Sequence, residues 1–142
     1  MRAGVDHAAL IRPFLSSEAR PRFTDIDPGT KKRTKLLNGL CHDYESTLDW
    51  RIAQPIPAAE QTAELMAPLL RKLGAGRTCY VLCCSEEWDG LQVPLADALR
   101  ALIGNGLPVL LICVPDLLAY FEPEYDGGAG QRFSLQRSGK SH

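Results

Sequence analysis

The sequence predicts an α/β protein in which N-terminal helices precede a β-α-β unit with a small parallel or mixed sheet. Apolar residues recur every three or four positions over 29–53 and 58–73, which is typical of amphipathic helices. Two short, continuous apolar runs, 78–84 and 108–114, flank a third helical pattern and indicate strands buried on both faces. Strand, helix and strand joined by short connections favour parallel strands with a right-handed crossover.

Prolines divide the N-terminal half into separate helices. A short helical pattern covers 6–20, and a long helix is predicted over 29–53, ended by Pro55. The next helix, over 58–73, contains Pro68, which removes one backbone hydrogen bond and should kink or split it. We therefore expect two or three helices before the first strand.

The C-terminal half is less regular. Pro94 suits the first turn of the helix between the two apolar runs, and 104–106 has the glycines of a helix stop. Residues 116–121 fit either a short helical turn or another strand, and 132–136 alternate weakly, as an edge strand does. The length of 142 residues is that of one domain. We expect a single α/β domain over 1–137 and a flexible tail over 138–142.

Composition narrows the cellular setting and the classes of partner. The net charge of -1 provides no field that would attract nucleic acid or a membrane surface. The longest apolar run, 107–120, is broken by prolines and is too short to span a bilayer, and 1–15 lack the apolar core of a secretory signal. Five cysteines, an odd number in apolar surroundings, do not suggest a disulfide framework. We expect a soluble cytoplasmic protein without a membrane or nucleic-acid partner.

The candidate ligand or partner surface lies after the two predicted strands. If these strands are parallel, the loops that follow them lie at one edge of the sheet, where ligands bind in open α/β folds. The surface comprises Ser85, Glu86, Glu87, Trp88, Asp89 and Asp116. Converging carboxylates could bind Mg²⁺ and orient a phosphate-containing substrate. The alternative is that they are solvated loop charges, and Trp88 is either a binding platform or a side chain packed on the core.

The segment 41–45 combines cysteine, histidine and acids, which suggests either a nucleophile with its base or a metal site. Sequence neighbours point to different sides of a helix, however. We therefore favour a packed Cys41 and a surface His42, and we expect no metal site and no cofactor.

The other thiols give no stronger signal. Cys79 and Cys83 are too far apart along a strand for one zinc ion. Cys84 ends its strand, where a nucleophile could lie, but the sequence gives no reason to place a histidine beside it.

A basic run, Lys31, Lys32, Arg33 and Lys35, opens the long helix. It indicates either contact with an acidic partner or a solvated face balanced by the aspartates before it.

Two classes of function remain. The favoured one is a small binding or regulatory module that acts through a protein partner or a second copy of the chain. The alternative is a small enzyme of phosphate or acyl chemistry, with or without Mg²⁺, whose site lies at the C-terminal ends of the strands. The sequence assigns no catalytic residue, because no nucleophile has an evident base and no basic or glycine-rich element faces the carboxylates.

Overall fold

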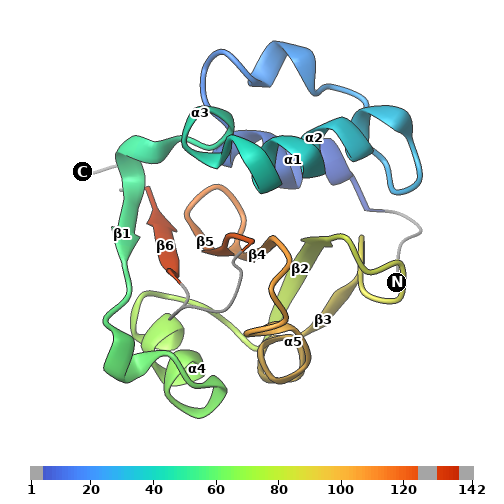
Figure 1. The fold of residues 1–142 in the computed structure, drawn as a ribbon. Helices are drawn as coiled ribbons and strands as arrows, with labels where there is room; N and C mark the ends of the chain where they lie inside the picture. Colours follow the sequence, from blue (N-terminus) through green and yellow to red (C-terminus); the bar gives the residue numbers. More distant parts are fainter. Residues whose placement is uncertain (1–4, 125–130, 138–142) are drawn as a thin grey trace.

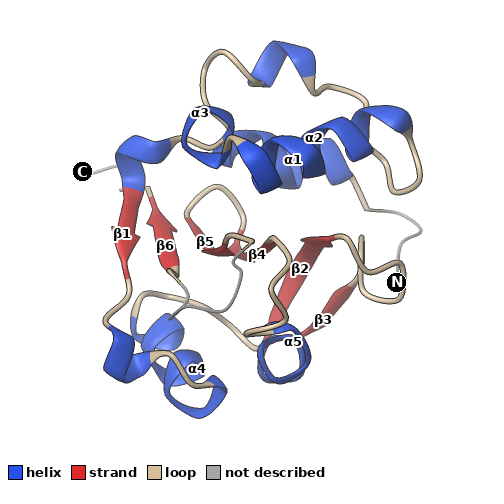
Figure 2. Cartoon of the chain, viewed as in Figure 1, coloured by secondary structure: helices blue, strands red, loops and turns tan. Residues whose placement is uncertain are grey.

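A computed structural model describes residues 5–124 and 131–137 and contains a six-stranded sheet with helices on both faces (Figures 1 and 2). The strands are β1 (Ala53–Pro55), β2 (Thr78–Cys83), β3 (Gln92–Pro94), β4 (Val109–Val114), β5 (Leu118–Glu122) and β6 (Phe133–Gln136). Their order across the sheet is β1-β6-β5-β4-β2-β3, and every neighbouring pair is antiparallel. The predicted small parallel or mixed sheet is therefore wrong.

An unpredicted strand, β3, explains why β4 runs antiparallel to β2 instead of parallel to it. The loop after β2 turns the chain back on itself: the Val81 N–H donates to the Leu91 carbonyl over 2.9 Å, and the Gly90 N–H to the Val81 carbonyl over 2.8 Å. The chain then runs along β2 in the opposite direction, with Thr78 facing Pro94. The next helix therefore begins beside the start of β2, and β4 enters the sheet antiparallel. One extra reversal changes a β-α-β crossover into an antiparallel sheet.

The helices form two layers (Figure 1). One face of the sheet, here called the α2 face, is covered by α1 (His7–Ile11), α2 (Lys31–His42) and α3 (Tyr44–Thr47). The opposite face, the α5 face, is covered by α4 (Ala63–Lys72) and α5 (Leu95–Leu102). Short 3₁₀ turns are Arg12–Phe14, Arg20–Arg22, Trp50–Ile52 and Ala58–Glu60. Side chains alternate between the two faces along each strand, so that both apolar layers share the one sheet.

The buried strands keep this alternation. Tyr80 and Leu82 lie in the core of the α2 face, and Cys79, Val81 and Cys83 lie in that of the α5 face. Burial of both faces accounts for the continuous apolar run in the sequence.

The helix predicted over 29–53 is instead two helices that meet at Asp43. Asp43 has φ -154°, outside the helical region, and α3 begins at the next residue. Apolar spacing continued across this break, which is why periodicity alone predicted one helix. The two helices pack so closely that a Cβ atom added at Gly39 would lie 2.7 Å from the Thr47 Oγ1 atom.

Gly39→Ala should therefore destabilise the protein, although alanine is the better helix former. We expect the free energy of unfolding to fall by about 1 kcal/mol or more, as in an overpacked core. Thr47 cannot easily yield, since its side chain is buried and its hydroxyl donates to the Asp43 carbonyl over 2.8 Å. Urea unfolding measures the change. In a Thr47→Ala background the same substitution should be neutral or stabilising, and an equal loss there would contradict the clash.

The remaining elements give mixed outcomes. Of the alternatives for 116–121, the strand is confirmed, since β5 follows a tight turn in which Asp116 has φ 70°. The predicted strand over 132–136 exists, but it pairs with both β5 and β1 and is not an edge strand. The predicted tail, 138–142, lies outside the described residues, and the limits of the domain stay a prediction. Among the described residues, no helix has the length and apolar character needed to cross a bilayer.

Candidate metal centre

The acidic strand-end residues do not converge. β2 ends at Cys83, which faces Val109 at the start of β4, whereas Asp116 follows the far end of β4 at Val114. The loop 85–89 and Asp116 thus leave opposite ends of an antiparallel pair. A Mg²⁺ site shared by these loops required β2 and β4 to be parallel, and they are antiparallel.

Within the loop 85–89 the side chains have different environments. Trp88 is half-buried and packs on the core of the α5 face, and Ser85 is also half-buried. Asp89 is buried and forms an ion pair with Arg33. The exposed acids are Glu86, Glu87 and Asp116. Whether this loop contacts a partner stays a prediction.

The partner of Asp89 comes from the basic run that opens α2. The Arg33 side chain points inward and is almost fully buried: its Nη2 lies 2.6 Å from Asp89 Oδ1 and its Nε 3.0 Å from Oδ2. Its Nη1 donates to the Ile26 carbonyl and to the Tyr80 hydroxyl. The expectation of a fully solvated basic face is therefore wrong at this position. Arg33 joins the N-terminal half of the chain to the sheet.

His7 extends this buried network. Its Nδ1 lies 2.6 Å from the Tyr80 hydroxyl, which also accepts a hydrogen bond from Arg33. Burial, and next the positive charge of Arg33, lower the pKa of His7, although Asp27, Asp89 and Asp6 act in the opposite direction. A neutral His7 that carries its proton on Nε2 accepts the Tyr80 proton at Nδ1, whereas a doubly protonated ring would leave that proton without its acceptor.

The stability of the fold should therefore decrease in mild acid. A lowered pKa in the folded state means that the unfolded chain binds the proton more readily, so the contribution of His7 is complete above pH 6.5. It is lost as the pH falls through 6.5 toward the lower folded pKa. Chemical unfolding from pH 8 to pH 5 would measure this, with His7→Gln as the control that should flatten the profile. Equal slopes in both proteins would contradict the assignment.

A different cluster brings metal-ligating atoms together. Cys41 and His42 end α2, and Glu124 follows the end of β5; one ligand atom from each, Sγ, a ring nitrogen and a carboxylate oxygen, all lie within 4.8 Å of one another. Cys41 is half-buried, and His42 and Glu124 are exposed. Sequence reasoning considered Cys41 and His42 but rejected a site because they are neighbours. It missed Glu124, because the last apolar segment before it was assigned only to residue 121 and no pattern covered the residues that follow.

The two neighbouring ligands lie at the C-terminal end of α2. His42 is the last residue of α2, and the chain leaves the helical conformation at Asp43. The end of a helix exposes unpaired carbonyl groups and the negative end of the helix dipole, which favours a cation. The C-terminal end of α2 therefore adds a favourable field to the three side chains.

The thiol of Cys41 is protonated at neutral pH. Burial, and then a hydrogen bond to the Glu124 carboxylate and its negative charge, raise the pKa of Cys41 to about 11. A catalytic thiol needs the opposite shift, toward a lower pKa. The environment therefore does not suit a free thiolate nucleophile, whereas a metal cation would supply the positive charge that deprotonates the thiol.

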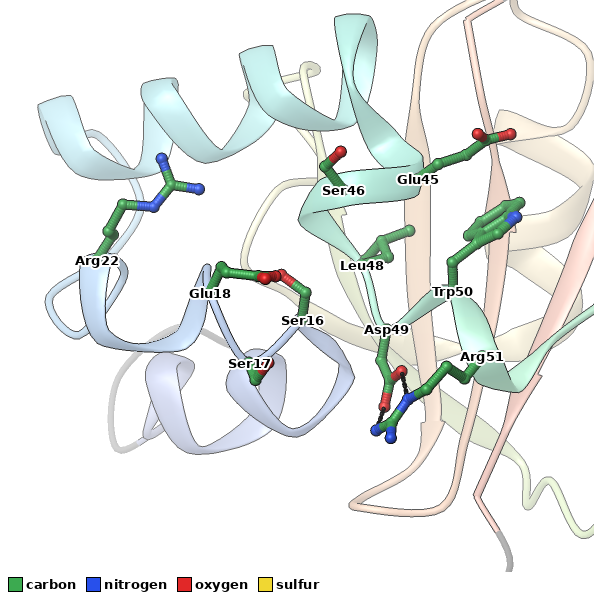
Figure 3. A pocket seen from close by; sticks show the side chains of 10 residues that line it. All are labelled: Ser16, Ser17, Glu18, Arg22, Glu45, Ser46, Leu48, Asp49, Trp50 and Arg51. Carbon is green, nitrogen blue, oxygen red and sulfur yellow. Dashed lines mark hydrogen bonds and ion pairs between the residues drawn. The ribbon is translucent and has the colours of Figure 1, made fainter.

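A cavity lies beside the helices of the α2 face (Figure 3). This cavity of about 630 Å³ is lined by residues of 16–22 and 45–51. Asp49 holds Arg51 through two hydrogen bonds of 2.9 and 3.0 Å, while Glu18, Glu45 and Arg22 add charges of both signs. A lining of mixed charge favours no one class of ligand, and we assign no function to this cavity.

Comparison with protein-family models, with curated proteins and with solved structures finds no match to this chain.

Proposed function

We propose that this protein binds a divalent transition-metal ion, of which Zn²⁺ is the best fit, through Cys41, His42 and Glu124. The proposal rests on the three ligand atoms lying within 4.8 Å of one another. In a tetrahedral zinc site with bonds of about 2.0–2.3 Å, ligand atoms are about 3.5 Å apart. Partly or fully exposed side chains can close that difference by small rotations.

The ligand types select the metal. Sulfur and imidazole nitrogen favour Zn²⁺ and its neighbours over Mg²⁺ or Ca²⁺, which prefer oxygen alone. One carboxylate oxygen beside them is common in zinc sites. The preference for a transition metal separates this proposal from the Mg²⁺ site considered from the sequence.

The class of function that we propose is the binding or regulatory module favoured by the sequence, now with a metal ion as its ligand. A metal ion held by α2 and by the segment after β5 would join a helix of the α2 face to the C-terminal end of an inner strand of the sheet. We favour this class over an enzyme, because the loop 85–89 and Asp116 leave opposite ends of the β2–β4 pair and the pKa of the Cys41 thiol is raised.

Titration of the reduced full-length protein with Zn²⁺, followed by calorimetry, tests the proposal. We expect one saturable site per chain and a higher melting temperature in Zn²⁺; at about 100 times the Kd the metal should add about 2.7 kcal/mol. Cys41→Ser and Glu124→Gln should each weaken binding about tenfold or more, because each replaces a direct ligand and the loss of an outer-shell partner alone already costs about 10–100-fold.

Glu87→Gln is the matched control, since it neutralises another exposed glutamate. It should leave the Kd unchanged. Absence of saturable binding, or equal affinity in the Glu124→Gln and Glu87→Gln variants, would rule out this site.

A further inference from the structure

The end of β2 lies near the candidate metal centre because the sheet is antiparallel. Val109, at the start of β4, faces both Cys83 at the end of β2 and Glu122 at the end of β5. The two chain segments that follow, carrying Cys84 and Glu124, therefore leave the same edge of the sheet. They are two strand spacings apart, or about 10 Å between backbones, a span that a cysteine and a longer glutamate can bridge through one ion.

The alternation of side chains places Cys84 on the appropriate face. Tyr80 and Leu82 lie in the core of the α2 face, and Cys83 lies in that of the α5 face. Continuing this alternation by one residue puts Cys84 on the side of the sheet that α2 covers. Its side chain is exposed, whereas that of Cys83 is buried. Cys84 is therefore accessible on the side from which Cys41 and His42 approach.

The Cys84 thiol lies outside the group of three. Among the described residues, the ligand atoms within 4.8 Å of one another are those of Cys41, His42 and Glu124 alone. Cys84 must therefore turn toward the ion, and its exposed side chain is free to rotate.

We propose that Cys84 is the fourth ligand and completes a closed Cys₂-His-Glu site. This inference rests on the proposed metal binding and goes further, because the number of protein ligands decides the role of the ion. Three protein ligands leave a position for water, as in catalytic zinc sites, whereas four close the sphere, as in structural sites. Here the ion would link the ends of α2 and β2 and the segment after β5, as a structural or regulatory element without hydrolytic chemistry.

The absorption spectrum of the Co²⁺-substituted protein tests the inference. Tetrahedral Co²⁺ gives visible ligand-field bands, and each bound thiolate adds charge-transfer absorption in the near ultraviolet. We expect wild type to show the intensity of two thiolates. Cys84→Ser and Cys41→Ser should each reduce it by about half. Cys83→Ala, which removes the neighbouring thiol on the other face, should leave it unchanged.

The possible failures are distinct. If wild type shows the intensity of one thiolate and Cys84→Ser has no effect, the fourth ligand is wrong while the three-ligand site stands. If wild type shows no tetrahedral Co²⁺ bands, both proposals fail. Since Cys84 is exposed, its serine variant should fold, and circular dichroism before Co²⁺ addition verifies this.

Discussion

Asp89→Ala should lower the free energy of unfolding by about 3–5 kcal/mol, because it leaves a buried arginine without its counter-charge. Both carboxylate oxygens of Asp89 accept hydrogen bonds from Arg33, and Oδ1 also accepts one from the Cys83 N–H over 3.1 Å. Arg33 is 1% exposed and cannot reach water without rearrangement. The loss is large relative to the 5–15 kcal/mol typical of a folded domain.

Urea unfolding of Asp89→Ala beside Asp97→Ala gives the comparison. Asp97 also pairs with an arginine, Arg100, over 2.7 Å, but these side chains are 51% and 61% exposed. Its removal should cost less than about 1 kcal/mol. If Asp89→Ala does not fold, Asp89→Asn provides the measurement, since it keeps the shape and one acceptor; it should still lose more than Asp97→Ala. Equal losses at the two positions would contradict the buried-pair account.

Asp89 also has a consequence for the candidate metal centre. Its hydrogen bond to the Cys83 N–H fixes the backbone immediately before Cys84. Asp89 therefore supports the geometry of the proposed site without being a ligand.

Glu122→Ala should produce a loss of similar size, about 3–5 kcal/mol, on the α5 face. Glu122 is fully buried and accepts three hydrogen bonds: from the Tyr120 hydroxyl over 2.8 Å, from Arg132 Nε over 3.2 Å and from the Gly104 N–H over 2.8 Å. The carboxylate thus ties β5 to the end of α5 and to the segment before β6. Its removal leaves three donors without this acceptor and leaves Arg132 without its counter-charge, although Arg132 keeps its hydrogen bond to Gln61.

A double-mutant cycle with Arg132→Met separates the charge from the packing. The double variant buries no uncompensated charge, so it should recover part of the stability lost in Glu122→Ala. Glu122→Gln, which keeps an acceptor oxygen, should be intermediate. Chemical unfolding of wild type, Glu122→Ala, Arg132→Met and the double variant measures the coupling energy. If the losses of the two single variants simply add in the double variant, the ion pair does not contribute.

Sequence patterns were informative wherever the signal lies within one element. The apolar runs correspond to β2 and β4, and the periodic stretch after Pro94 corresponds to α5. Each assignment depends only on which side chains of a segment are buried, and periodicity reports that directly. The break at Asp43 was missed because α2 and α3 bury one continuous apolar stripe.

The direction of the strands could not be obtained in this way. It depends on β3, a strand of three residues that ends in proline and has too few positions for any periodicity to be recognised. Its pairing with β2 is made by backbone groups that every residue carries, so no side-chain pattern reports it.

The sequence by itself determined α5, the buried strands β2 and β4, and the residue types Cys41, His42 and Cys84. Only the tertiary structure decided that Glu124 joins Cys41 and His42, that Cys84 leaves the same edge of the sheet, and that Asp89 is buried against Arg33. The physical reason is the distance along the chain over which each property is set. Burial patterns are local properties of a segment, whereas a site built from α2, β2 and β5 depends on strand order and direction, which backbone pairing sets across the whole chain.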